Sequence, residues 1–201
     1  MIKIHKTILY AIVALISLSA CSTYKSPKKW DLVFEEDFSS LSDTTWLISD
    51  RYFSNEVVRF QPEHVIQNDS ILFLIINRTE SLEEMYYGAE ICTRDYYGYG
   101  LYEVVMRAAP GSGIVSSFFT LKKTSSPGNE IDIEFAGKNP EVVIFNVWNK
   151  HGKEKPEWYN LPFNASKEYH SYAIEWSPRK IRWYVDGKRK RTIRGHIPVG
   201  P

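Results

Sequence analysis

From Trp30 onward the sequence is a succession of short apolar segments typical of β-strands, and we find no convincing amphipathic helix among them. The segments are rich in β-branched and aromatic residues and are bounded by Gly, Pro, Asn or Asp. Many strands at short spacing without intervening helices predict an all-β fold, an antiparallel β-sandwich or jelly roll. The clearest segments are residues 71–76, 101–106, 113–121, 130–135, 142–148, 169–176 and 181–185.

The clearest turn is Asp186-Gly187, a pair that favours a two-residue hairpin between residues 181–185 and 189–193. The basic run 188–191 that follows is then interpreted as a solvated edge strand. Lysines and arginines number 25 and acidic residues 24, so the overall charge is close to balanced. This balance does not favour electrostatic binding of nucleic acid, and we expect no nucleic-acid partner.

The N-terminus has the order of a secretory leader. Lys3 and Lys6 precede an apolar run at residues 8–18, which is too short to span a bilayer comfortably. A signal anchor or a buried helix would leave the following Leu-Ser-Ala-Cys21 unexplained, whereas these four residues resemble a bacterial lipobox. We therefore expect a lipoprotein signal peptide at residues 1–20, cleaved before Cys21, whose sulfur is acylated.

The rest of the chain then divides into a short polar tether at residues 21–29 and one domain at residues 30–201. The lipid on Cys21 would anchor the exported protein to the bacterial cell envelope, at the outer membrane or the cell surface. Acylation of Cys21 leaves Cys92 as a single thiol, so no intrachain disulfide is expected. We interpret Cys92 as a small buried hydrophobe.

The most informative segment is Asn-Glu-Ile-Asp-Ile-Glu-Phe at residues 129–135. Strand side chains alternate, so Glu130, Asp132 and Glu134 share one face while the apolar residues between them face the core. An ordinary solvated strand face is the simpler interpretation, but such a face usually intersperses other residues among its acids because like charges repel.

A close set of carboxylates separates its own pKa values, which suits one ionised nucleophile and one protonated acid. Retaining glycosidases place these two groups about 5 Å apart. The Cα atoms of Glu130 and Glu134 would lie about 13 Å apart on an extended strand, so twist and long side chains must close the gap. Spacing alone thus permits glycoside hydrolysis without establishing it.

Three further motifs, at residues 97–104, 113–120 and 183–188, surround this strand in order. Together with it they closely resemble glycoside hydrolase family 16, and within it the bacterial lichenases, across roughly residues 30–198. The resemblance implies a concanavalin-like jelly roll with a concave glucan-binding face. It also implies an endo-acting β-glucanase that hydrolyses β-1,3-1,4-glucan or a related β-glucan by retaining double displacement.

By position in the family motif, Glu130 is the expected nucleophile, Glu134 the expected general acid/base and Asp132 the residue that tunes the pair. The resemblance also implies four substrate contacts. Glu90 and Asn146 would hydrogen-bond sugar hydroxyls, Trp148 would stack on a glucose ring where lichenases have Tyr, and Asn55 matches less securely. We expect a monomer that needs no cofactor, and we assign no metal.

The sequence also departs from the family. Gly128 and Asn129 stand where the family usually has Trp-Asp, and Cys92 replaces a cleft Arg, for which Arg94 could compensate. The chain stops at residue 201 where family members continue, so we expect the C-terminal strands to be missing. Such an end would weaken folding, because it leaves a sheet edge unpartnered and part of the core uncovered.

The alternative function is a non-catalytic, cell-surface glycan-binding lipoprotein derived from the same fold. Gly128, Asn129 and the early end favour it, but a binding protein has no need of a paired acid and nucleophile. Transglycosylation remains open beside hydrolysis, because both reactions pass through the same glycosyl-enzyme intermediate.

Overall fold

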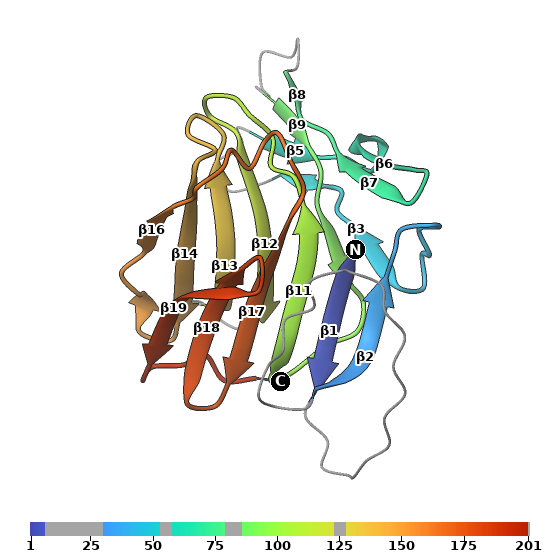
Figure 1. The fold of residues 1–201 in the computed structure, drawn as a ribbon. Helices are drawn as coiled ribbons and strands as arrows, with labels where there is room; N and C mark the ends of the chain where they lie inside the picture. The colour runs from blue at the N-terminus through green and yellow to red at the C-terminus, as the bar shows by residue number, and fades with distance from the viewer. Residues whose placement is uncertain (7–29, 53–57, 79–85, 123–127, 201) are drawn as a thin grey trace, which may run out of the picture. The chain divides into compact units, whose positions relative to one another are not determined.

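The computed structural model describes residues 1–6, 30–52, 58–78, 86–122 and 128–200. The chain divides into two compact units (Figure 1), one formed by Met1–Glu35 with Tyr97–Pro201 and the other by Glu36–Tyr96. The first unit carries the strand with the three acidic residues, and the second carries Glu90. The described residues contain no α-helix.

One sheet of the first unit has six strands, in the order β19-β18-β17-β11-β1-β2. The antiparallel ladder between β11 and β17 runs from Gly100 opposite Trp176 to Met106 opposite His170. The strands are β1 (Ile2–Lys6), β2 (Asp31–Glu36), β11 (Gly100–Met106), β17 (His170–Ser177), β18 (Lys180–Val185) and β19 (Lys188–Arg194).

The other sheet of the first unit has five strands and carries the acidic residues. Its order is β12-β13-β14-β15, and β16 also pairs with β14. Figure 1 shows β12, β13, β14 and β16 side by side. The strands are β12 (Val115–Lys122), β13 (Asn129–Ala136), β14 (Val142–Asn149), β15 (Gly152–Lys153) and β16 (Glu157–Asn160).

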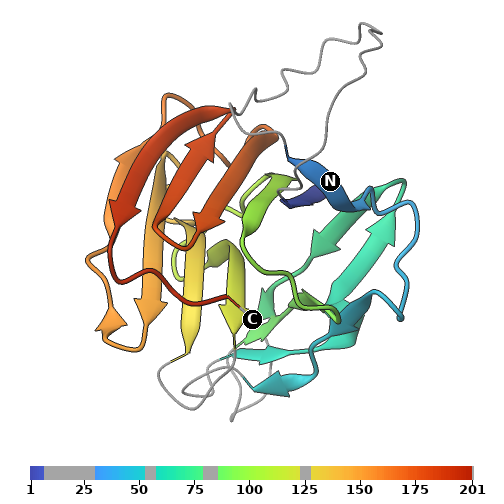
Figure 2. The ribbon, with the colours of Figure 1, turned by 90° about the horizontal axis from the view of Figure 1, so that it is seen from below.

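Alternating apolar side chains of both sheets meet in one core, so the two sheets form separate layers (Figures 1 and 2). The ring centroids of Phe135 and Tyr172 lie 4.9 Å apart, and those of Phe145 and Trp183 lie 5.6 Å apart. Each pair joins one strand of each sheet, which is how two sheets pack face to face. This arrangement confirms the all-β antiparallel sandwich predicted from the strand pattern.

Each of the seven clearest segments of the sequence corresponds to a strand of the structure, with bounds that differ by a few residues at most. The Asp186-Gly187 turn between β18 and β19 is also confirmed. Asp186 has φ 48° and Gly187 φ 67°, so both residues adopt the left-handed conformation that a two-residue hairpin requires. The ladder shifts register between Trp183 and Tyr184, as at a β-bulge.

A buried carboxylate links β17 to β18. Glu175 is 1% exposed, and its two oxygens accept hydrogen bonds from Arg182 Nη1 at 3.0 and 3.1 Å. The Tyr184 hydroxyl donates to Glu175 Oε2 at 2.5 Å. A charge removed from water in this way is stable only when paired and hydrogen-bonded, so we interpret the cluster as structural.

The second unit is built from small sheets of short strands. Strand β3 (Trp46–Ile48) pairs with β10 (Ile91–Thr93), and β6 (Val65–Asn68) pairs with β7 (Ile71–Leu74). A four-stranded sheet has the order β4-β5-β9-β8, in which the pairing of β5 with β9 is parallel. Its strands are β4 (Arg51–Tyr52), β5 (Val58–Phe60), β8 (Asn77–Arg78) and β9 (Tyr86–Gly88), and a 3-10 turn, Pro62–His64, follows β5.

The first residues of the expected leader form strand β1. Ile2 and Ile4 stand opposite Val104 and Tyr102 of β11, and Ile4 is buried in the core. The remainder of the leader and the tether, residues 7–29 with Cys21, lie outside the described residues, so the expected processing stays a prediction. A search of the described part of the chain finds no helix that is long and apolar enough to cross a membrane.

Candidate active site

Strand β13 places the three acidic residues as the sequence alternation predicts. Ile131, Ile133 and Phe135 are fully buried in the core between the sheets. Because strand side chains alternate, Glu130, Asp132 and Glu134 lie on the opposite face of the five-stranded sheet. We call these three residues the acidic row.

Close backbone packing fixes the end of β13. A Cβ added to Gly137 would lie 2.7 Å from the carbonyl oxygens of Ala109 and Gly111, closer than real Cβ atoms come. Gly111 N donates to Gly137 O at 3.0 Å, and Gly137 N donates to Ile114 O at 2.8 Å. A glycine is therefore required where β13 ends, directly after the segment that carries the acidic row.

Cross-strand partners surround each carboxylate, since directly opposite residues of antiparallel strands point to the same face. The neighbours on β12 and β14 are Leu121 and Trp148 for Glu130, Phe119 and Asn146 for Asp132, and Ser117 and Ile144 for Glu134. The acidic row is thus flanked by aliphatic and aromatic side chains as well as by polar ones.

Burial distinguishes the middle carboxylate from its neighbours. Asp132 is 3% exposed, while Glu130 and Glu134 are partly exposed. The indole Nε1 of Trp183, on the other sheet, donates to the backbone oxygen of Asp132 at 3.0 Å. The centre of the strand is therefore tied to the core, and the two outer carboxylates remain accessible to a ligand.

Asn146 is a buried residue that is hydrogen-bonded to one carboxylate of the acidic row. It is 2% exposed, and its Nδ2 donates a hydrogen bond to Glu134 Oε2. This bond orients Glu134, and the expected contact of Asn146 with a sugar hydroxyl stays a prediction. The register places Asn146 opposite Asp132, and Glu134 is the next residue of β13 on the same face.

Trp148 is placed as a stacking role requires. It stands directly opposite Glu130 on β14, and 37% of its surface is exposed. Its ring therefore contributes apolar surface beside the expected nucleophile. The stacking itself stays a prediction.

Glu90, in the second unit, is engaged with two side chains of that unit. Its Oε1 accepts a hydrogen bond from Ser49 Oγ at 2.5 Å and from Arg51 Nη2 at 2.8 Å, and Arg51 Nη2 also lies 3.0 Å from Oε2. The Arg51 guanidinium lies over the Phe60 ring, 5.2 Å from its centroid. Sequence reasoning missed Arg51, because the pair depends on the register that joins Ser49 to Glu90.

Compensation by Arg94 for the arginine replaced by Cys92 stays a prediction. Arg94 Nε donates to the backbone oxygen of Asp43 at 2.5 Å. Burial, and to a lesser extent the nearby charge of Glu90, raise the pKa of the Cys92 thiol to about 11. The thiol is therefore neutral at physiological pH and partly buried, as the expected role of a small hydrophobe requires.

Asn55 lies outside the described residues, so its expected sugar contact has no structural description. Among the residues that the structure describes, there is no group of three or more His, Cys, Asp or Glu side chains placed to hold a metal ion.

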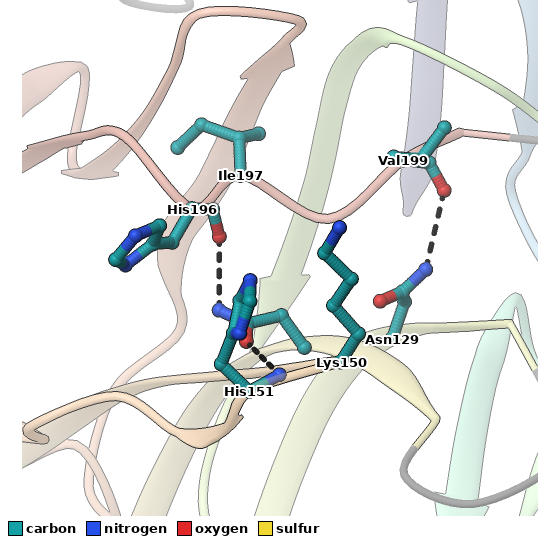
Figure 3. Close-up of a pocket in the computed structure, with 7 residues that line it drawn as sticks. Asn129, Lys150, His151, His196, Ile197 and Val199 are labelled. Atoms are coloured by element: carbon teal, nitrogen blue, oxygen red, sulfur yellow. Dashed lines mark hydrogen bonds between the residues drawn. The ribbon is translucent and has the colours of Figure 1, made fainter.

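A small pocket lies where β13 begins and β14 ends, and it does not include the acidic row (Figure 3). Asn149 Nδ2 donates to His196 O at 2.9 Å, and Asn129 Nδ2 donates to Val199 O at 3.4 Å. These bonds tie the segment after β19 to the ends of both strands. Asn129, which replaces the usual Asp of the family motif, thus has a structural partner.

The fold is an antiparallel β-sandwich, and its candidate site is a strand with three alternating carboxylates. The sequence model of glycosyl hydrolases family 16 matches residues 53–198. The chain therefore belongs to this family, as its motifs predicted.

Two curated relatives are beta-glucanases. That of Acetivibrio thermocellus is 39% identical over 169 residues, which are 82% of this chain and 50% of the relative. That of Paenibacillus macerans is 39% identical over 174 residues, which are 84% of this chain and 73% of the relative. The chain thus spans about half the length of the first relative and nearly three quarters of the second.

Solved structures agree with the fold. A prokaryotic beta-1,3-1,4-glucanase (lichenase) derived from a mouse hindgut metagenome superimposes with a TM-score of 0.77 at 37% identity, over 83% of this chain and 80% of that one. The beta-glucanase of Bacillus licheniformis gives the same TM-score of 0.77 at 35% identity, over 83% and 79%.

Proposed function

We propose that this protein is an endo-acting β-glucanase that hydrolyses β-1,3-1,4-glucan. The acidic row on β13 carries the proposal, because it presents two partly exposed carboxylates on either side of a buried one, with Asn146 hydrogen-bonded to Glu134. The substrate is taken from the relatives, which are beta-glucanases and include a lichenase.

In the first step of the proposed reaction, a carboxylate oxygen of Glu130 attacks the anomeric carbon while the glycosidic bond breaks. Glu134 gives its proton to the leaving oxygen. In the second step, water attacks the same carbon, Glu134 takes the proton of that water, and the ester bond to Glu130 breaks. Two inversions at the anomeric carbon retain its configuration.

The other residues of the face support these two steps. Asn146 holds one oxygen of Glu134, which limits the rotamers of the side chain that must move the proton. Asp132 lies between the two glutamates on the same face of β13 and is 3% exposed, which is where a residue that tunes the pair would lie. Trp148 offers its ring to the sugar bound next to Glu130.

The test is release of reducing ends from barley β-glucan, laminarin and xyloglucan by the purified protein, with NMR to follow the anomer first formed. We expect release from barley β-glucan with retained configuration. Glu130→Gln should abolish it, while the matched variant Glu63→Gln, in the 3-10 turn of the second unit, should not. Inverted product would contradict double displacement. Glucan binding without release by the unsubstituted protein would replace the enzyme with the glycan-binding alternative.

We also propose that the protein is exported, acylated on Cys21 and held at the cell envelope as a monomer. The order of Lys3, Lys6, the apolar run and Leu-Ser-Ala-Cys21 supports the anchor. Expression in a bacterium fed labelled palmitate should label the protein and leave Cys21→Ser unlabelled. Equal labelling of both would contradict acylation at this residue. Light scattering of the detergent-free Cys21→Ser protein tests the oligomeric state, and we expect the mass of a monomer.

A further inference from the structure

Trp158 lies on the acidic face of the five-stranded sheet, in the same cross-strand line as Glu134. Strand β16 pairs with β14 so that Trp158 stands opposite Ile144, and Ile144 stands opposite Glu134. Two strand spacings, about 10 Å, thus separate the backbones of Trp158 and Glu134. Figure 1 shows β16 at the edge of this sheet, beside β14.

The neighbours of Trp158 settle which way it points. Tyr159 packs against the core between the sheets, and Glu157 makes an ion pair with Arg191 Nε at 3.2 Å. Arg191 in turn lies over the core residue Trp183, 5.1 Å from its ring centroid. Residues 157 and 159 therefore face the core side, and Trp158 faces the side of the acidic row.

Trp158 is exposed to 60%, although a tryptophan gains more from burial than any other side chain. It is not alone on this face, because Val115, Leu121 and Trp148 are also exposed there and stand on β12 and β14. Isolated apolar side chains on a surface need no explanation, but four that share one face with paired carboxylates do. Such a face suits a ligand that presents both C–H and hydroxyl groups.

The strand beneath Trp158 is held in place on the core side. Lys190 Nζ donates to the Tyr159 hydroxyl at 3.2 Å, and Leu161 N donates to Glu141 O at 2.7 Å. The backbone of β16 is thus anchored by contacts that do not involve the indole. The strand that carries Trp158 is therefore held by residues on either side of it, and the 60% exposure of Trp158 leaves much of its surface available to a ligand.

We propose that Trp158 is an aromatic subsite for a glucosyl unit of the substrate, bound on the β16 side of the cleavage point. A β-linked glucose ring presents apolar C–H faces, which stack on an aromatic ring, while its hydroxyls remain free to hydrogen-bond. Asn160, exposed two residues further along the same strand, lies on the same face as a polar neighbour. The inference rests on the proposed glucanase function and extends it to the recognition of long chains.

The test compares Trp158→Ala with the matched control Tyr169→Ala, which removes an exposed aromatic side chain outside this sheet. Kinetics are measured on barley β-glucan and on a short aryl glycoside that cannot reach β16. We expect Trp158→Ala to raise KM for the polymer about tenfold with kcat retained, and to leave the short substrate unchanged. Trp158→Phe should recover most of the loss, and the control should behave as the unsubstituted protein.

Calorimetric binding of a long β-glucan oligosaccharide to Glu130→Gln, with and without Trp158→Ala, separates the subsite from the reaction. A weaker affinity in the double variant supports the subsite even where the unsubstituted protein releases no sugar. Unchanged KM and unchanged affinity would overturn the subsite while leaving the glucanase intact. Loss of activity on both substrates, or absence of binding by Glu130→Gln itself, would also overturn it.

Discussion

The pairing of Asn146 with Glu134 adds a positioning role to the sugar contact that the sequence predicts for Asn146. The side-chain NH2 of Asn146 has two N–H donors, and one of them is used on the carboxylate of Glu134. We therefore treat Asn146 as a positioning residue for the proposed acid/base.

Asn146→Ala should consequently lower kcat on barley β-glucan by about 10- to 100-fold, because the proton-transfer group loses its fixed orientation. KM should change little, because the orientation of Glu134 acts on the chemical step. The free energy of unfolding should fall by about 1 kcal/mol for the lost buried hydrogen bond. Asn68→Ala, on the exposed strand β6, is the control. A rise in KM at constant kcat would instead support the sugar contact and contradict the positioning role.

Cys92 offers a test of its environment through its acidity. The pKa of its thiol is raised to about 11, so the reactive thiolate is scarce at pH 8 and becomes abundant only as the pH approaches that value. In the Cys21→Ser protein, where Cys92 is the only thiol, iodoacetamide should react slowly at pH 8 and faster with rising pH. Unfolding in urea should bring the rate at pH 8 up to that of an ordinary cysteine. Equal rates in the folded and unfolded protein would contradict the burial.

At the scale of elements, the sequence alone predicts those strands in which core and solvent-facing residues alternate over several positions. Strand β13 alternates acidic and core residues without interruption, and the Asp186-Gly187 turn sets its own hairpin, so both could be predicted. Strands of two or three residues, such as β4 and β8, have no room for a pattern and form only where distant segments pair. The Arg51–Glu90 pair and the position of Trp158 depend on such non-local register, which local sequence does not encode.

The glycines that flank β13 should respond differently to the same substitution. Gly137→Ala forces a carbon to within 2.7 Å of two backbone oxygens, which cannot move as a side chain can. Gly128→Ala, at the other end of β13, is the matched control, because a Cβ added there would lie 3.3 Å from the backbone oxygen of Lys122. We expect Gly137→Ala to destabilise the protein by about 2 kcal/mol or more and Gly128→Ala by less, in urea unfolding. The reverse order would show that the close approach near Gly111 is not maintained.

At the scale of the whole molecule, one segment has two incompatible roles. Residues 2–6 are the charged start of the proposed leader, and they are also β1, which lies between β11 and β2 in the six-stranded sheet. Val105 N donates to Met1 O at 2.8 Å, and Lys3 Nζ lies 3.0 Å from Glu35 Oε1. Cleavage before Cys21 would remove this strand and leave β11 and β2 without the partner that joins them.

The protein that begins at residue 22 should therefore be less stable than the uncleaved protein with Cys21→Ser, when both are made in the cytoplasm. It loses the ladder between β1 and β11 and the burial of Ile4, and the side chain alone contributes about 1.5 to 3 kcal/mol. A lower Tm and greater aggregation through the opened sheet edges are the expected results. Ile4→Asp in the uncleaved protein should reproduce the loss, while Lys3→Ala, at a partly exposed ion pair, should not. Equal melting of the long and short proteins would show that β1 adds nothing to the folded state and that removal of the leader leaves the sandwich unchanged.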